Sequence, residues 1–293
     1  MKEKLWGFVR LLIILVGVGI LVYPSLSEYL YEKNSSMAVS SYDDSIRRME
    51  QARKDELRGQ AEAYNRRLAE ENGFSKPALD EYNNPITPPD YWDILDVDGN
   101  GMMGYISIPR MNVTIPMYHG TSEEVLQVAI GHLQNTSLPV GGESTHTVLS
   151  GHRGLPSKAL FTDLDQVQVG DVFYLTVLNQ TNCYQVDQIL TVLPHETDEL
   201  SIVKGEDYVT LVTCTPYGVN SHRLLVRGTR IPYTPQSGET IPTADVEISA
   251  WDEAADAVSA FDHRPCRSGG HSVAARIGIL YSKIIQLRRN PLI

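Results

Sequence analysis

The stretch from Thr210 to Gly228, TLVTCTPYGVNSHRLLVRG, contains two short apolar runs joined by a polar loop. Alternation in each run predicts a β-strand, and the short loop predicts that the two strands pair antiparallel. Cys214 ends the first strand and Arg223 begins the second, so pairing would bring them to the same end of a sheet. A buried structural cysteine needs no cationic neighbour, whereas a nucleophilic thiolate and the oxyanion it creates do. The spacing therefore indicates a catalytic cysteine with a stabilising arginine.

A candidate base lies upstream, in THTVLSGHRG at residues 145–154. Thr145–Ser150 alternates like a strand, and His152 follows its end beside Gly151, where the backbone can approach closely. Cysteine, histidine and a third polarising group form the general arrangement for thiol acyl transfer. On pattern alone, three unrelated structural residues are an equally good interpretation. Three other histidines lie in or near apolar runs and are predicted to be structural: His119, His132 and His146.

Many short alternating runs follow Gly104, among them GYISIP, VTIPMY, DVFYLTVL and CYQVDQILTVL. LNQTN, at residues 178–182, separates two of them and predicts a hairpin. Strands this short and numerous predict a mainly β fold, a closed or nearly closed barrel. The pattern stops near Tyr233, and the stretch that follows is loop-like.

The N-terminus predicts a membrane anchor. LWGFVRLLIILVGVGILVY, from Leu5 to Tyr23, carries one charge and has about the ~20 residues needed to cross a bilayer. Lys2 and Lys4 precede it and acidic residues follow it, so the positive-inside rule places the N-terminus in the cytoplasm and the rest outside. A cleaved signal peptide is the alternative, but YPSLSEYL offers no small-x-small cleavage site.

Residues 27–73 are rich in Ala, Glu, Arg and Gln, with apolar residues at helical spacing, which predicts a helical region. We expect this charged helix to be a solvated spacer. Prolines mark residues 74–90 as a loop. In the DVDGNG stretch that follows, Asp96, Asp98 and Asn100 match the start of a calcium loop. The required twelfth-position Glu is Ser107, so we expect a simple turn and no metal.

The composition of the 293-residue chain excludes some partners. A net charge of −11, with no long basic stretch, argues against nucleic acid. The 3 cysteines are too few and too widely spaced for a disulfide framework or a zinc knuckle. At least one thiol is therefore free.

The motifs together resemble those of one enzyme family. MGYISIP, YHGTSEEVLQ, THTVLSGHRGLP, LFTDL, VGDVFYL and TCTPYGVNSHRLLVRG occur in this order. They are similar to the motifs of class C sortases, the pilin-polymerising sortases of Gram-positive bacteria. The similarity covers residues from about 100 to 232, and a match of several linked motifs is more specific than any single one.

The resemblance implies an eight-stranded β-barrel and cysteine transpeptidation without a cofactor. Cys214 would attack the Thr–Gly bond of an LPXTG-like sorting signal, and His152 would protonate the leaving amine. Arg223 would stabilise the substrate carbonyl and its oxyanion. A lysine of another pilin subunit would then resolve the thioester. The partners implied are pilins or surface proteins that carry such signals.

Class C sortases also resemble one another in a lid, commonly Asp-Pro-aromatic, over the active site. PPDYWDIL offers Asp90, Tyr91 and Trp92, with Tyr where the pattern has Pro, so either aromatic residue is a candidate to cover the thiol. Asp90 would pair with a cation in the groove, Arg223 being the first choice. The alternative is an ordinary loop that packs an aromatic side chain on the barrel.

The predicted organisation is an anchor (1–26), a helical region with the lid segment (27–99), a catalytic barrel (100–233) and a C-terminal tail (234–293). Residues 272–293 of the tail are too short and too charged to span a membrane. Three alternatives remain. They are a cysteine hydrolase, a housekeeping sortase that attaches proteins to peptidoglycan, and a non-catalytic adhesin-like β-domain.

Overall fold

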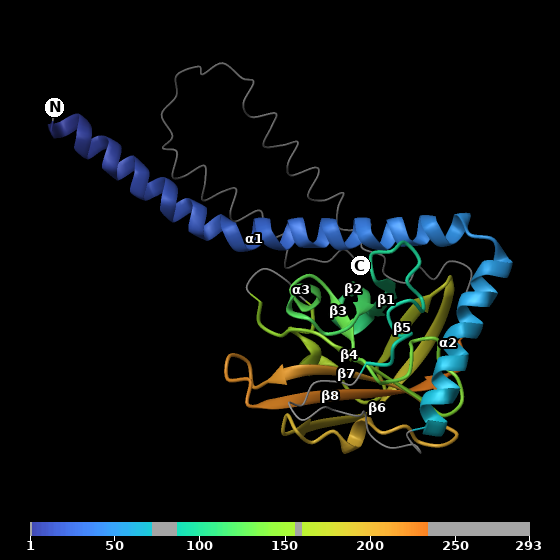
Figure 1. Cartoon of the computed structure of the whole chain (residues 1–293). Helices are drawn as coiled ribbons and strands as arrows, with labels where there is room; N and C mark the ends of the chain where they lie inside the picture. The colour runs from blue at the N-terminus through green and yellow to red at the C-terminus, as the bar shows by residue number, and fades with distance from the viewer. Residues whose placement is uncertain (1, 72–86, 156–159, 234–293) are drawn as a thin grey trace. The chain divides into compact units, whose positions relative to one another are not determined.

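The computed structural model describes residues 2–71, 87–155 and 160–233. Two long helices, α1 (Lys2–Arg48) and α2 (Gln51–Glu71), precede the strands, and a short helix, α3 (Glu123–Leu126), lies among them (Figure 1). The strands are β1 (Met102–Ile108), β2 (Val113–His119), β3 (Ile130–His132), β4 (Thr145–Ser150), β5 (Val172–Val177), β6 (Gln180–Val192), β7 (Asp207–Thr215) and β8 (His222–Ile231). Three 3₁₀ turns complete the elements: η1 (Pro109–Met111), η2 (Leu164–Gln166) and η3 (Asp198–Leu200).

The strands form one closed barrel in the order β1-β2-β3-β4-β7-β8-β6-β5. The β2–β3 and β4–β7 pairs are parallel, and the other pairs are antiparallel. The prediction of an eight-stranded barrel is therefore confirmed. The predicted hairpin is present between β5 and β6, where Leu178 and Asn179 have φ of 50° and 61°, as a two-residue hairpin turn requires.

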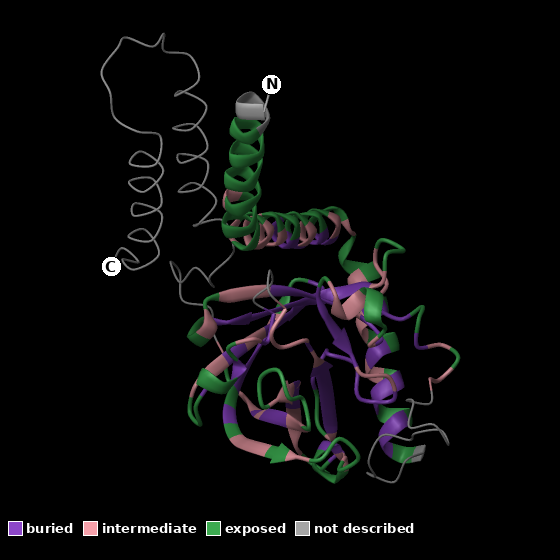
Figure 2. Ribbon diagram, turned by 90° about the vertical axis from the view of Figure 1, so that its left-hand side faces the viewer, coloured by how far each residue is buried: buried purple, intermediate pink, exposed green. Residues whose placement is uncertain are grey.

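The first half of α1 supplies the predicted apolar segment. Among the described residues, one helix is long and apolar enough to cross a membrane, and its apolar stretch is exposed (Figure 2). Large side chains such as Trp6, Ile13 and Leu21 are exposed. An exposed apolar helix of this kind suits a bilayer and not water.

The second half of α1 and all of α2 pack on the barrel, so the expectation of a solvated spacer is wrong. Ile46, Leu57 and Tyr64 are buried in the same hydrophobic core as the strand residues. The Tyr42 hydroxyl donates to the Met103 carbonyl (2.9 Å) and accepts from the Leu178 amide (3.1 Å). The apolar stripe that predicted a helix therefore faces the barrel, and only the opposite face is solvated.

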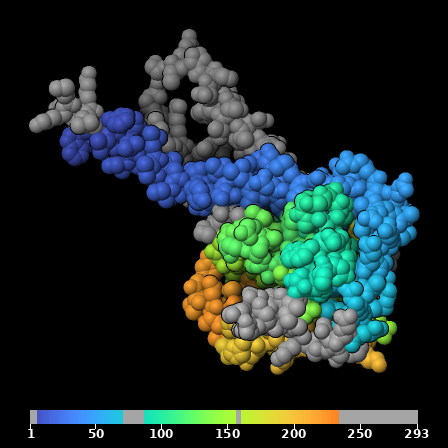
Figure 3. Space-filling view, in the orientation of Figure 1, coloured from blue at the N-terminus to red at the C-terminus, as the bar shows by residue number. Residues whose placement is uncertain are grey.

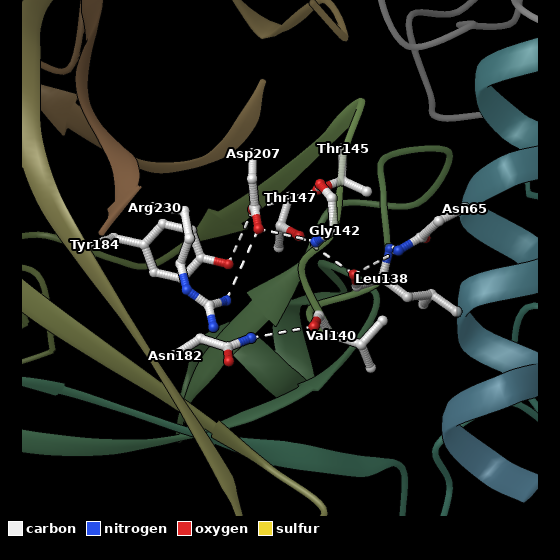
Figure 4. A network of polar contacts seen from close by, with 10 residues as sticks. All are labelled: Asn65, Leu138, Val140, Gly142, Thr145, Thr147, Asn182, Tyr184, Asp207 and Arg230. Carbon is white, nitrogen blue, oxygen red and sulfur yellow. Dashed lines mark hydrogen bonds and ion pairs between the residues drawn. The ribbon is translucent and has the colours of Figure 1, made fainter. Parts of the chain in front are cut away.

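Polar contacts fasten the loop between β3 and β4 to α2 and to the barrel (Figure 4). The Asn65 side chain on α2 donates to the Leu138 carbonyl (3.1 Å) and accepts from the Leu138 amide (2.7 Å). At the other end of the loop, the Asp207 carboxylate accepts from the Gly142 amide (2.8 Å) and the Tyr184 hydroxyl (3.1 Å). Burial raises the pKa of Asp207, against the effect of these hydrogen bonds. This half-buried carboxylate lies at the start of β7, whereas Cys214 lies near the end of that strand.

The DVDGNG stretch forms the expected turn before β1. The Asp96 carboxylate accepts from the Gly101 amide, and the Asn100 side chain accepts from the Met102 amide, each at 2.9 Å. These oxygens thus satisfy backbone donors of the turn. The predicted tail, 234–293, and most of the predicted loop 74–90 lie outside the described residues.

Candidate active site

Three neighbouring strands bring the predicted catalytic residues together. Cys214 on β7 is directly opposite Arg223 on β8 in the antiparallel register, as predicted. On its other side β7 pairs in parallel with β4, where Ser150 is opposite Val212. His152 follows two residues after Ser150, as Cys214 follows two residues after Val212. Cys214 therefore lies on the strand between the one that bears Arg223 and the one that leads to His152.

Backbone hydrogen bonds extend the β4–β7 pairing to the residue before His152. The Gly151 amide donates to the Val212 carbonyl (3.1 Å), and the Thr213 hydroxyl donates to the Gly151 carbonyl (2.7 Å). A Cβ at Gly151 would come within 2.7 Å of the Phe161 ring, so this close approach requires glycine. The position of His152 relative to β7 is thus fixed by main-chain contacts.

An apolar strip leads to the three residues. Val212 and Leu225 lie two residues from Cys214 and Arg223 along their strands, and so share their face of the sheet. They pack with Val148 and Leu200 in a hydrophobic cluster separate from the main core. Leu200 belongs to η3, in the connection between β6 and β7. These side chains form an apolar surface beside the partly accessible thiol of Cys214.

Arg223 is held by its own loop. Its Nη1 donates to the carbonyl of His222 (3.1 Å) and to the carbonyl of Asn220 (3.3 Å). Both acceptors are neutral carbonyl groups, so neither contact neutralises the positive charge of the guanidinium. An arginine in this state can stabilise a negatively charged oxygen formed at Cys214.

Two charged residues near the site were not singled out from the sequence. Arg153 has a nearly buried side chain that pairs with Asp165 and donates from Nη1 to the Thr215 hydroxyl (3.3 Å). It therefore connects the residue after His152 to the residue after Cys214. Glu123 on α3 places Oε2 3.6 Å from His152 Nε2. Arg153 is adjacent to His152 in the sequence, but no sequence signal connected Glu123 with the site.

The predicted lid residues lie between α2 and the ends of β2 and β3, and the predicted partner of Asp90 is wrong. The Asp90 carboxylate pairs with Arg67 on α2, at 2.7 and 2.9 Å, and not with Arg223. In the space-filling view, the teal segment after α2 lies against the cyan surface of α2 (Figure 3). The segment is therefore fastened to α2.

The two aromatic residues of this segment are also anchored. Tyr91 is fully buried, bonds to His132 Nδ1 (2.9 Å) and accepts from the Gly120 amide (2.9 Å). Trp92 is half-exposed and packs against Gly120, where a Cβ would come within 2.8 Å of its ring. These contacts favour the alternative of an ordinary loop that packs aromatic side chains on the barrel. A lid role for Asp90, Tyr91 and Trp92 stays a prediction.

The three other histidines are structural, as expected, and each is hydrogen-bonded through both ring nitrogens. His119 faces the carbonyls of Gly101 (2.9 Å) and Ile94 (2.8 Å). Burial lowers the pKa of His132 to about 3 and that of His146 to about 4. Both are therefore neutral at physiological pH and poorly suited to proton transfer there.

A barrel that holds a cysteine and an arginine on adjacent strands, with a histidine just beyond the end of the next strand, has the arrangement of a sortase-type cysteine transpeptidase, and the comparisons agree. Residues 106–231 match the sortase domain family. Sortase A of Staphylococcus aureus is 26% identical over 219 residues, which cover 73% of this chain and 88% of that protein. The chain belongs to the sortase family.

Solved structures of class C sortases are more similar still. The crystal structure of sortase C1 from Streptococcus agalactiae is 50% identical, with a TM-score of 0.62, and covers 68% of this chain and 100% of that one. A structure of Streptococcus pneumoniae sortase C, described in terms of catalysis and pilin substrate specificity, is 46% identical with a TM-score of 0.60. It covers 69% of this chain and 100% of that one. Within the family, the chain is a class C sortase.

Proposed function

We propose that this sortase cleaves an LPXTG-like sorting signal and joins pilin subunits through a lysine isopeptide bond, with Cys214, His152 and Arg223 as its catalytic residues. The observation that carries the assignment is the strand register, which sets Cys214 directly opposite Arg223 on β8 and pairs β7 on its other side with β4, the strand that leads to His152. The similarity to class C sortases, one of them described by its pilin specificity, supports the substrate class.

The chemistry follows from the positions of the three groups. The Cys214 sulfur attacks the carbonyl carbon of the threonine–glycine bond, and the carbonyl oxygen becomes an oxyanion that Arg223 stabilises. The C–N bond then breaks, and His152 gives its proton to the leaving amine. This leaves a thioester between Cys214 and the threonine, with the glycine released as a new amino terminus.

The second half of the reaction reverses the roles of thiol and amine. His152, now neutral, accepts a proton from the incoming lysine ε-amine as its nitrogen attacks the thioester carbonyl. The C–S bond breaks, the Cys214 thiolate leaves, and an isopeptide bond remains. A hydrolase with the same residues would accept water at this step, so the acceptor distinguishes the two activities.

The apolar strip beside the thiol supports a substrate with an apolar side chain before the cleaved bond. Val212 and Leu225 offer aliphatic contacts on the face that carries Cys214. Burial of a leucine-sized side chain stabilises binding by about 1.5–3 kcal/mol. The leucine of an LPXTG-like signal has this size and polarity.

We also propose that the chain is anchored with its N-terminus in the cytoplasm and its barrel outside. Positive charges at Lys2, Lys4 and Arg10 precede or begin the apolar helix, and Glu28 and Glu32 follow it. This asymmetry supports the orientation by the positive-inside rule. The barrel would then meet substrates at the outer face of the membrane.

The test uses the full chain in detergent with a pilin that carries an LPXTG-like signal, and mass spectrometry of the products. We expect intermolecular isopeptide bonds with the native protein and none with Cys214→Ala. Cys183→Ala is the matched control, since Cys183 is a buried thiol on β6, and it should retain the products. Isopeptide formation by Cys214→Ala would refute the mechanism. A product cleaved by water alone, with an acceptor pilin present, would support a hydrolase instead.

A further inference from the structure

The Nε2 atom of the His152 ring has an unusual environment. His152 Nε2 is buried, and among the residues that the structure describes it has no hydrogen-bond partner. The nearest anionic atom is Oε2 of Glu123, at 3.6 Å, slightly beyond hydrogen-bond distance. A catalytic histidine commonly uses one nitrogen for proton transfer while an acidic group orients the other.

Glu123 is itself held in place. It begins α3, whose start is capped by the Ser122 hydroxyl, which accepts from the Val125 amide (3.5 Å). The Gln127 side chain, one helical turn further on, donates to Oε1 of Glu123. One carboxylate oxygen is therefore occupied by Gln127, while the other is the oxygen closest to His152.

The other charges around His152 would not favour its positive form. Arg223 lies across the thiol on β8, and its guanidinium is bonded to backbone carbonyls. Arg153 is the next residue in the chain, and its charge is paired with Asp165. Glu123 is thus the carboxylate that pairs with the imidazole itself. Because His152 must carry a proton when the leaving amine departs, an anion at this position assists the first step.

We propose that Glu123 is a positioning residue that orients the His152 ring and stabilises its protonated form during acylation. The inference deepens the proposed function and rests on His152 being the proton donor. It adds to the cysteine, histidine and arginine a carboxylate from a fourth part of the fold, the helix α3.

The size of the effect is limited by solvent. The Glu123 side chain is 68% exposed, and exposed ion pairs are screened by water and by salt. We therefore expect the loss of the carboxylate to have a small effect, confined to the alkaline side of the pH profile of acylation. On that side of the profile the rate should drop about threefold, and the difference should shrink at high salt.

The experiment measures single-turnover acylation of the full chain by a sorting-signal peptide, as thioester detected by mass spectrometry, between pH 6 and 10. Glu123→Gln keeps the shape of the side chain and removes its charge. Glu124→Gln removes a charge from the neighbouring position of the same helix and is the matched control. We expect only Glu123→Gln to shift the alkaline limb, and the shift to be smaller at about 1 M salt than at about 0.05 M.

The outcomes separate this inference from the proposed function. If the native chain forms no thioester at all, the proposed function fails, and the inference fails with it. If the native chain forms the thioester and the profiles of Glu123→Gln and Glu124→Gln both overlay it, only the role of Glu123 is refuted. A uniform loss of rate at every pH and salt concentration would also refute it, because a purely structural defect has that signature.

Discussion

Replacing His146 with glutamine should flatten the dependence of stability on pH. In the folded chain His146 Nδ1 donates to the Ser201 carbonyl (2.8 Å), and Nε2 accepts from the Thr210 hydroxyl (2.7 Å). Both contacts suit a neutral ring, and burial lowers the pKa to about 4 from 6.5. Glutamine keeps one donor and one acceptor but binds no proton in this range.

The sign of the effect follows from proton binding. Between pH 6.5 and 4 the unfolded chain binds a proton at position 146 and the folded chain does not, so acid favours unfolding. The stability that depends on the neutral ring is complete above pH 6.5 and is lost as pH falls toward 4. Between pH 7.5 and 4.5 this single group should remove about 2.5 kcal/mol from the free energy of unfolding.

The assay is a series of thermal melts of the full chain and of His146→Gln from pH 7.5 to 4.5. The difference in stability between them should narrow by about 2.5 kcal/mol, or about 5–10 °C in melting temperature for a domain of this size. His132 is common to both proteins, so its own proton binding cancels. His195→Gln replaces an exposed histidine and should run parallel to the native chain. Parallel curves for His146→Gln as well would show that a protonated ring is tolerated between Ser201 and Thr210.

Two further predictions concern the active site. Arg223→Lys keeps the charge but loses the planar fork, so single-turnover acylation should fall by about 10²–10³; a rate near that of the native chain would mean that Arg223 only braces its own loop. Trp92→Ala should leave the reaction of Cys214 with a small thiol reagent unchanged in a labelling time course, because Asp90 and Tyr91 still fasten the segment to α2 and β3. Faster labelling than in the native chain would restore Trp92 to the role of a lid.

Strand positions were predictable where alternation was long enough to see. Seven strands correspond to apolar–polar runs in the sequence, and the eighth, β3, was missed. β3 has only 3 residues, Ile130–His132, and all are buried. No period can be recognised in three residues, and the strand exists because β2 and β4 flank it on both sides. Its place in the barrel depends on tertiary pairing alone.

The helices show a different limit. Spacing of apolar residues predicted the helical region, yet the charged composition suggested a solvated spacer. Leu57, Ala61 and Tyr64 are each almost completely buried against the barrel. A helical period shows that one face is apolar, but it does not show what covers that face. The barrel that covers this face is identified by contacts between α2 and residues far along the chain, such as Leu138.

The residues of the candidate site were easier to predict when they lie close to one another in the sequence. Cys214 and Arg223 are joined by one short loop, so their pairing followed from the sequence. His152 reaches them through the parallel β4–β7 pair, whose long connection gives no local signal of the pairing. The strand pattern made His152 a candidate base, and the resemblance to sortases strengthened that assignment. Glu123 comes from a fourth element, α3, and neither spacing nor resemblance indicated it.

The same register explains why the site can tolerate loss of its reactive groups. The backbone fixes His152 and Cys214, through the Gly151 amide, the Thr213 hydroxyl and the β7–β8 ladder. Within the described part of the chain, no hydrogen bond joins the side chains of Cys214, His152 and Arg223, so none of them holds another in position. Removing the thiol therefore costs little packing, and Cys214→Ala should fold like the native chain. The groups stay aligned because rigid strands carry them, which is how a site can be preorganised for a charge that forms only during reaction.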